Sequence, residues 1–355
     1  MAHETNWNDI MPSEQTTVAI VGGGISGLTA ARELARAGRR VQLFDKGRGV
    51  SGRSSTRYAA EGAHFDHGAQ YFTVRSDRFR IEVDEWLASG VAAEWRPRLV
   101  SIDGAGQPSQ RILSSEPPAR YVGTPGMNAI AKRLADQARE AGAEITPAVR
   151  VASLKRNEGR WALSDKQGTV LCESDLVLVT APGPQAAELL AASPAMANAA
   201  RSAEMTGCWT AMVAFRDPIA ASFDAAFIND TPEASPLAWA ARNSSKPSRP
   251  CVETSGECWV LHASAEWSEA NLRLDPNEAA RHLTEAFFKL GVSSGEPNQQ
   301  HGHLWRYAIP QEPLKETHIE EERLGLYACG DWCGGPRVEG ALLSGLSAAE
   351  AITQR

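Results

Sequence analysis

The first clear pattern of apolar and polar positions lies near the start of the chain. Residues 17–21 are apolar and β-branched, which predicts a buried strand. A glycine-rich turn follows, and then a helix that Gly38 ends, predicted from apolar residues at helical spacing: Leu28, Ala31, Leu34 and Ala35. Residues 41–46 form a second strand that ends in an acid. This order predicts a βαβ unit of the doubly wound type.

The rest of the chain mixes both periodicities and shows no internal repeat. Strand-like runs alternate with glycine turns, and helical runs carry small apolar residues on one face. The predicted elements are a helix in 126–142, strands in 150–181 with turns at 157–159 and 167–168, helical residues in 183–204, strands in 208–262 around a Pro/Ser-rich loop at 243–250, a capped helix in 275–291, and a strand, glycine loop and helix in 325–352.

Composition and charge narrow the class of protein. A chain of 355 residues is too long for one compact core, so two domains are expected. The net charge of -7 argues against a nucleic-acid partner, which would need a basic face. The most apolar run, residues 176–181, is far shorter than a membrane span. Residues 1–15 are polar and read as a flexible leader without a secretion signal, so a cytoplasmic location is expected.

The cysteines and histidines suggest neither a disulfide framework nor a metal site. Six cysteines in so long a chain are expected to be free thiols, and Cys329 and Cys333 have the wrong spacing for a CxxC pair. The stretch HFDHGAQYF at 64–72 could be a metal site, an acid/base cluster or a polar turn. His64 and His67 lack a second ligand pair in a clear pattern, as does the pair His301 and His303, so no metal is predicted.

The first glycine loop predicts a bound dinucleotide. Gly22 permits the tight turn, Gly24 lets the backbone approach a pyrophosphate, and Gly27 lets helix and strand pack closely. The start of the helix, at Ile25 and Ser26, would present unpaired N–H groups to the phosphates. Asp45 and Lys46 end the second strand, where the carboxylate can accept hydrogen bonds from a ribose diol. A glycine loop without a dinucleotide is the alternative.

Three further features favour FAD over NAD as that dinucleotide. A basic, glycine-rich loop with Gly52 and Arg53 follows the second strand and can wrap a phosphate chain. Asp331, near the C-terminus, could take the ribityl hydroxyls. The final helix would direct a positive dipole at the flavin, and its candidate cofactor residues are Arg337, Val338, Glu339 and Ala341.

Together these stretches resemble the renalase family, bacterial branch, within the amine-oxidase-like FAD flavoproteins. The motifs that carry the resemblance are AIVGGGISGLTAA, GRGVSGRSSTR, FDHGAQYFT, HLWRYAIP and YACGDWCGGPRVEGALLSGLSAAEAI. It is strongest at 17–75 and 302–352 and weak at 185–300. The family usually shows GGR followed by Met-Ala-Thr, whereas this chain has Ser51-Gly52-Arg53-Ser54-Ser55-Thr56.

The resemblance assigns further site residues. It places the turn from Asp66 to Tyr71 beside the isoalloxazine ring, with His67, Gly68, Ala69 and Gln70 at the flavin. Gln70 and Tyr71 would also face the substrate cavity. It also implies that Trp305 and Tyr307 border the cavity, that His262 reaches its wall, and that the backbone of Val151 reads the adenine. The plainer alternatives are that Trp305 is a core residue and that the histidines only hydrogen-bond within their turn.

The resemblance implies oxidation of the 2- or 6-dihydro isomers of NAD(P)H to NAD(P)+, by hydride transfer to non-covalent FAD, with O2 as the final acceptor and H2O2 as a product. The chain has no second GxGxxG, so a nicotinamide substrate would dock directly over the flavin. The candidate catalytic residues are Tyr71, Trp305, Gln70 and His262. An FAD-dependent amine oxidase, with Trp305, Tyr71 and Tyr307 as an aromatic cage, and a flavin-binding scaffold remain alternatives.

The expected fold class is α/β. A Rossmann-type FAD-binding domain, like that of glutathione reductase or p-hydroxybenzoate hydroxylase, would span residues 16–78, 112–183 and 322–355. An interleaved α+β substrate domain with a mixed or antiparallel sheet would take residues 79–111 and 184–321.

Overall fold

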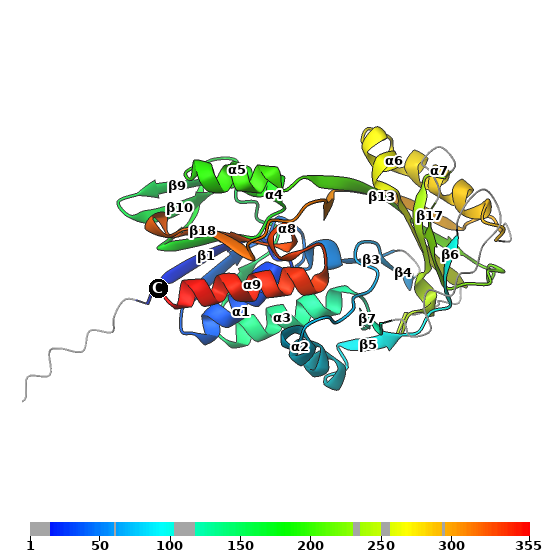
Figure 1. Cartoon of the computed structure of the whole chain (residues 1–355), viewed down its shortest axis with the longest axis horizontal. Coiled ribbons are helices and arrows are strands. Elements are labelled where there is room, and N and C mark those ends of the chain that lie inside the picture. Colours follow the sequence, from blue (N-terminus) through cyan, green and yellow to red (C-terminus); the bar gives the residue numbers. More distant parts are fainter. Residues whose placement is uncertain (1–14, 60–61, 103–117, 230–234, 250–255, 293–294) are drawn as a thin grey trace, which may run out of the picture.

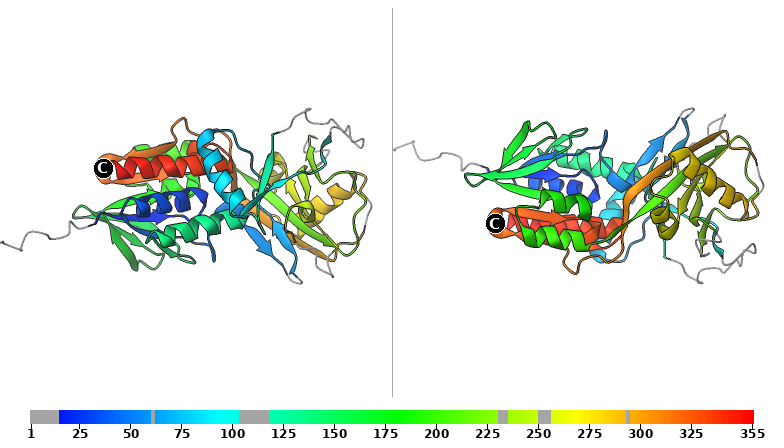
Figure 2. Two further views of the ribbon diagram at one scale, coloured as in Figure 1. Left: turned by 90° about the horizontal axis from the view of Figure 1, so that it is seen from below. Right: turned by 90° about the horizontal axis from the view of Figure 1, so that it is seen from above.

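The computed structural model describes residues 15–59, 62–102, 118–229, 235–249, 256–292 and 295–355. The chain forms two bodies that lie side by side, each built on a six-stranded sheet (Figures 1 and 2). This arrangement confirms the predicted α/β class with a mixed second sheet. The proposed leader at 1–15 lies, apart from Gln15, outside the described residues. No helix of the described part is long and apolar enough to cross a membrane.

The sheet of the first body has the order β18-β19-β12-β1-β2-β8 and is parallel except at β18. The glycine loop follows β1 at the carboxyl edge of this sheet, where ligands of doubly wound folds bind. The strands are β1 (Thr17–Val21), β2 (Arg40–Phe44), β8 (Glu144–Thr146), β12 (Leu176–Val179), β18 (His318–Glu321) and β19 (Leu326–Cys329).

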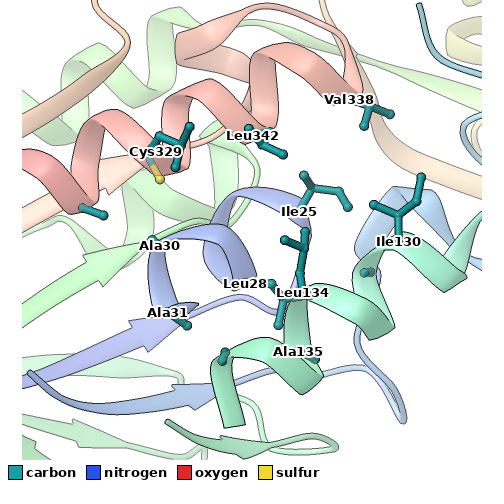
Figure 3. Packing of buried hydrophobic residues seen from close by; sticks show 14 of the residues in the cluster. Ile25, Leu28, Ala30, Ala31, Ile130, Leu134, Ala135, Cys329, Val338 and Leu342 are labelled. Atoms are coloured by element: carbon teal, nitrogen blue, oxygen red, sulfur yellow. The ribbon is translucent and has the colours of Figure 1, made fainter. Parts of the chain in front are cut away.

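Three helices cover one face of this sheet: α1 (Ile25–Arg36), α3 (Asn128–Glu140) and α9 (Val338–Thr353). Figure 3 shows Leu28 of α1 near Leu134 of α3, with Leu342 of α9 above them. These apolar contacts fix the start of α1 relative to the start of α9. The helix predicted from the first pattern is confirmed, and Gly38 follows its end with φ +79°.

A second layer covers the opposite face of the same sheet. It consists of a three-stranded antiparallel sheet and two short helices, which share one apolar core with β1, β12 and β19. The predicted turns of this sheet are confirmed, because Gly159 and Gly168 take φ values of +87° and +84° there. The elements are β9 (Ser153–Asn157), β10 (Arg160–Ser164), β11 (Val170–Ser174), α4 (Gly183–Leu189) and α5 (Pro194–Ser202).

The second body is a mixed sheet of order β17-β13-β16-β15-β14-β6, with helices α6 and α7 against it. The capping pattern predicted for α7 is confirmed, since the Asp275 carboxylate accepts hydrogen bonds from two backbone N–H groups of its first turn. The elements are β6 (Leu99–Ile102), β13 (Met205–Phe215), β14 (Ala225–Ile228), β15 (Leu237–Arg242), β16 (Glu257–Ala263), α6 (Ala265–Ala270), α7 (Pro276–Phe288) and β17 (Gln299–Pro310).

Two short pairs of strands, the hairpin β3–β4 and the pair β5–β7, lie between the two bodies (Figure 1). Helix α2 and the one-turn helix α8 pack on the first body. The bounds of these elements are β3 (Thr56–Tyr58), β4 (His64–Asp66), α2 (Asp77–Ala88), β5 (Ala92–Trp95), β7 (Arg120–Gly123) and α8 (Asp331–Gly334).

The packing bears on the predicted domain boundaries. Phe79 and Trp86 of α2 share the apolar core of α1 and α3, while α4 and α5 share the core of β1 and β12. Strand β18 is an edge of the first sheet. We therefore propose that α2, α4, α5 and β18 belong to the cofactor-binding part, although residues 79–111 and 184–321 were assigned to the substrate domain.

The carboxylate of Asp66 joins the two bodies. It accepts hydrogen bonds from Thr56 Oγ1 of the same hairpin at 2.7 Å and from the backbone N–H of Met127, at the start of α3 in the first body, at 2.9 Å. From the loop after β15 it accepts Arg249 Nη2 at 2.6 Å and Lys246 Nζ at 3.3 Å. Burial opposes ionisation, but Lys246, Arg249 and the Met127 N–H outweigh it and hold the pKa of Asp66 below its usual value.

We predict that Asp66→Asn destabilises the protein strongly, by about 3–5 kcal/mol, because it leaves two buried cations without their carboxylate. Urea denaturation measures the loss, and Asp84→Asn, on the exposed side of α2, is a control that should change stability by less than about 0.5 kcal/mol. Equal stability of the two variants would contradict the assignment of Asp66 as the junction.

The same carboxylate makes stability depend on pH. Because the pKa of Asp66 is lower in the folded protein than in the unfolded chain, its contribution to stability is complete above the unfolded pKa and disappears as pH falls through the folded pKa.

Candidate cofactor and substrate site

One open cavity of about 1980 Å³ extends from the glycine loop of the first body to the sheet of the second. Its described lining includes most of the predicted site residues, from positions far apart in the sequence. These are Gly22, Gly24, Ile25, Ser26, Asp45, Lys46, Gly52, Arg53, His67, Gly68, Ala69, Gln70, Tyr71, Val151, His262, Trp305, Tyr307, Asp331, Arg337, Val338 and Ala341. Gly27 and Glu339 are the predicted site residues absent from this lining.

The glycine loop has the geometry that a pyrophosphate needs. Gly22 takes φ +121°, and a Cβ there would lie 2.5 Å from Thr180 Oγ1. A Cβ on Gly27 would lie 2.0 Å from the carbonyl oxygen of Gly22, so this glycine serves helix–strand packing and has no place at the cavity wall. A Cβ on Gly24 would meet no atom within 4 Å. The open space at Gly24 faces the cavity, which fits a dinucleotide phosphate above the start of α1.

The end of β2 forms the next part of the site. The two oxygens of the Asp45 carboxylate accept the N–H groups of Gly23 at 2.5 Å and Gly47 at 2.6 Å, which fixes the carboxylate at the cavity wall. Each oxygen keeps a second lone pair, so a ribose diol can still bind. Lys46 donates to Gln185 Oε1 at 3.0 Å, and burial followed by repulsion from Arg150 lowers the pKa of Lys46.

Arg53 and Asp331 form a pair that sequence reasoning did not foresee. Arg53 Nη1 and Nη2 each donate to the Asp331 carboxylate at 2.7 Å, and Nη1 also donates to the Ala308 carbonyl at 3.0 Å. The carbonyl oxygen of Arg53 accepts the N–H of Ala69 at 2.9 Å. A Cβ on Gly68 would lie 2.0 Å from that oxygen, so the turn of Gly68 packs tightly on the Arg53 loop. The pair therefore ties both predicted cofactor loops and β17 to the 67–71 turn.

Three of the four cofactor residues predicted on the final helix line the cavity. Arg337, Val338 and Ala341 line the cavity at the start of α9. The Glu339 side chain is buried elsewhere, where it accepts the N–H groups of Arg75 at 3.0 Å and Ser76 at 2.8 Å just before α2. The Glu339 carboxylate thus supports the start of α2. The place of Glu339 among the cofactor-binding residues stays a prediction.

Two of the predicted histidines, His67 and His262, line the cavity. His67 packs on Trp305 and His303 with ring centroids 4.9 and 5.0 Å apart, and its carbonyl oxygen accepts Trp305 Nε1 at 2.8 Å. Burial, and then His303, lowers the pKa of His67 to about 3, and burial lowers the pKa of His262 to about 4. Both rings are therefore neutral at neutral pH. Within the described ranges, no three His, Cys, Asp or Glu side chains gather as a metal site.

Tyr71 stands in a group of aromatic rings at the second body. Its ring lies 5.7 Å from Trp239 and 6.2 Å from Trp95, and the guanidinium of Arg120 lies 5.5 Å from its centroid. Phe227 packs on Trp239 at 4.7 Å. Trp239, Phe227 and Arg120 also line the cavity but were not predicted, since nothing local in the sequence of β15, β14 and β7 marks these strands as cavity walls.

Positive charge dominates the cavity lining. Among its described residues, twelve are Lys or Arg and three are Asp or Glu. Asp45 is held by backbone N–H groups and Asp331 by Arg53, and the third acid is Glu188 on α4. The cations are Lys46, Arg48, Arg53, Arg57, Arg75, Arg120, Lys132, Arg139, Arg150, Lys166, Arg306 and Arg337. This lining favours anions, in a protein whose net charge is -7.

The described cysteines leave no reactive thiol at this wall. Cys172, Cys208, Cys258, Cys329 and Cys333 are free, and Cys251 lies outside the described residues. Cys208 alone of these five lines the cavity, and burial raises its pKa to about 12, so it stays protonated. Cys208 therefore offers no thiolate for attachment of a cofactor, and non-covalent binding stays a prediction.

Comparison with family models identifies two regions. A model described as NAD(P)-binding Rossmann-like domain matches residues 20–82, and a model described as flavin containing amine oxidoreductase matches residues 99–353. An L-amino acid dehydrogenase of Synechocystis sp. is 35% identical over 75 residues, which are 21% of this chain and 16% of the relative. The matched segment thus spans less than a fifth of that relative's length.

Solved structures resemble the whole chain. A putative protoporphyrinogen oxidase from Exiguobacterium sp. 255-15 has a TM-score of 0.72 at 14% identity, covering 96% of this chain and 99% of that one. An oxidoreductase from Methanosarcina mazei scores 0.67 at 14% identity, covering 94% and 100%. Wild-type putrescine oxidase bound to putrescine scores 0.67 at 14% identity, covering 97% and 100%. At these identities the likeness shows the fold.

We predict opposite behaviour for two neighbouring glycine variants. Gly24→Val should fold but lose FAD, because the new side chain occupies open cavity space where the pyrophosphate approaches. Gly27→Val should lower stability itself, because its Cβ clashes with the backbone at Gly22. Melting curves of apoprotein and flavin content after purification separate the two effects. A yellow Gly24→Val protein with wild-type flavin content would refute the placement of the phosphates.

Proposed function

This chain belongs to the flavin containing amine oxidoreductases, and we propose that it oxidises the 2- or 6-dihydro isomers of NAD(P)H to NAD(P)+. The motifs shared with the renalase family support this substrate class. FAD is the cofactor that the family implies, and the glycine loop, Asp45 and the Arg53 loop fit it. When bound, FAD accepts a hydride and passes the electrons to O2, which yields H2O2.

The charge of the cavity lining is the observation that carries the proposal. A dihydronicotinamide dinucleotide brings a pyrophosphate, and its NADP form brings one more phosphate. Arg57, Arg120 and Lys132 line the cavity and form no ion pair with an acid of the described residues. The cations of the lining outnumber the two negative charges of the FAD pyrophosphate. Arg57, Arg120 and Lys132 can therefore neutralise the phosphates of a second dinucleotide.

The aromatic walls suit a flat ring. Tyr71, Phe227 and Trp239 form one apolar surface, and His67 with Trp305 forms another. A dihydronicotinamide already donates hydride readily, so the protein has mainly to hold its C–H in reach of the acceptor and exclude water. The neutral His67 and His262 rings place no charge beside the developing nicotinamide cation. No general base is required of this lining.

Oxidation of a small amine is the second candidate. The family description and the fold shared with putrescine oxidase favour it, and Tyr71, Trp239 and Trp305 offer aromatic faces for an ammonium group. The charge of the cavity lining disfavours an amine substrate. Asp331 is already paired with Arg53, and the described lining offers no other carboxylate near the 67–71 turn. A cationic amine would also approach a cavity lined by twelve cations.

A panel of reductants tests the choice between the two candidates. Anaerobic mixing should bleach the flavin rapidly with isomeric dihydroNAD(P), slowly with ordinary NADH, and not at all with primary or secondary amines. Stopped-flow absorbance follows the reduction, and a peroxidase-coupled assay follows H2O2 once O2 is admitted. Rapid bleaching by an amine would exclude the dihydronicotinamide proposal and select the second candidate.

We predict that Tyr71→Leu slows hydride transfer about a hundredfold, because the substrate ring loses a wall and small misplacements are costly. FAD content should be unchanged, since no hydrogen bond of the Tyr71 side chain holds the described cofactor loops. Trp305→Leu should have a similar effect on rate but also loosen the turn, because Trp305 Nε1 donates to the His67 carbonyl oxygen. A Tyr71→Leu enzyme with the wild-type rate would remove Tyr71 from the substrate wall.

A further inference from the structure

Behind the cavity wall lies a buried cluster with more positive than negative charge. The side chains of Lys246, Arg249 and Asp66 are 0%, 1% and 0% exposed. Two cations thus share one carboxylate. Burial lowers the pKa of Lys246 to about 8 against the opposing effect of Asp66, so the ammonium remains largely protonated at neutral pH. Counted over the described residues, the cluster therefore holds one positive charge more than its carboxylate compensates, and water does not screen it.

Gln70 connects this charge to the cavity. Lys246 Nζ donates to Gln70 Oε1 at 3.2 Å, and Gln70 Nε2 donates to the carbonyl oxygens of Asp66 and Gly68. Both ends of the amide are thereby fixed. Gln70 lines the cavity, whereas Lys246 does not. The Gln70 side chain therefore lies between the Lys246 ammonium and a ligand bound in the cavity beside Gln70.

The described surroundings of Lys246 do not supply the missing negative charge. Its ammonium lies 5.5 Å from the centroid of the Trp95 ring on β5. His262 on β16 faces it as a neutral ring, and Arg249 on its own loop repels it. Among the described residues, Asp66 on β4 is the acid that acts on it.

The ring end of FAD is expected beside Gln70. The ribose end is set by Asp45 and the phosphates by Gly24, and the cavity continues from there past Arg53 to the 67–71 turn. A positive charge near the ring favours the uptake of electrons, because reduction adds negative charge to it.

We propose that Lys246 is a positioning residue whose buried ammonium fixes the amide of Gln70, and that the excess charge of the Lys246–Arg249–Asp66 cluster raises the reduction potential of the bound flavin. This proposal rests on FAD binding and is independent of which substrate delivers the electrons.

Two variants remove the excess charge in different ways. Lys246→Met leaves Asp66 paired with Arg249 and breaks the contact to Gln70, while Arg249→Gln leaves Asp66 paired with Lys246 and keeps that contact. Neither leaves an unpaired buried charge. Lys155→Met, on the exposed strand β9, is the matched control for the loss of one positive charge. The midpoint potential of the holoprotein flavin, measured against a reference dye, is the readout, with flavin content and melting temperature as checks of folding.

Both cluster variants should shift the ratio of oxidised to reduced flavin at a given potential about tenfold toward the oxidised form, which for a two-electron couple is about 30 mV. Lys155→Met should leave the potential unchanged. A shift in Lys246→Met alone would show that the contact to Gln70, and not the excess charge, acts on the flavin, and would overturn the charge proposal. Wild-type potentials in both variants would overturn the proposal as a whole. If Lys246→Met does not fold, Arg249→Gln decides the question of charge by the same criterion.

Discussion

The structure depends most on the single carboxylate of Asp66. It accepts five hydrogen bonds, from Thr56, Met127, Lys246 and twice from Arg249. These partners come from both bodies, so the ion pair fixes the relative position of the cofactor loops and the substrate sheet. Buried ion pairs add little net stability compared with apolar packing, but they are very costly to break. Asp66 therefore determines geometry more than it adds stability, and the geometry it determines is that of the 67–71 turn.

The distribution of charge separates the cavity from the rest of the molecule. The whole chain carries a net charge of -7, yet its cavity is lined mainly by lysine and arginine. A lining of this kind makes the electrostatic potential inside the cavity positive, so that the cavity attracts anions from solution. The negatively charged outer surface repels anions. The attraction weakens with added salt where the cations are exposed, and less where they are buried. Dinucleotides are suited to such a cavity because their charges lie away from the ring that reacts.

The site residues that could be predicted from the sequence are those whose position depends on local backbone geometry. Gly22, Gly24 and Gly27 have different roles that follow from one turn and one helix start, and Asp45 follows from the end of the next strand. The contact of Glu339 with the start of α2 could not be predicted, because the two partners lie 263 residues apart in sequence. Lys246 and Arg249 were missed because a Pro/Ser-rich loop gives no sign that its two cations are buried. The packing of helix α2 with α1 and α3 could not be predicted, because the apolar face of α2 alone does not say which core it joins.

The long pair β13 and β17 limits how the two bodies can move. Its ladder runs from Met205 opposite Pro310, next to the first body, to Ala214 opposite Gln299 within the second (Figure 1). Arg53 is attached to the same ladder through the carbonyl oxygen of Ala308. A hinge rotation of one body away from the other would bend the continuous strand pair β13–β17 and break its backbone hydrogen bonds. We therefore expect little hinge motion and a nearly constant distance between the two bodies. A substrate would then reach the flavin by rearrangement of side chains and connecting loops.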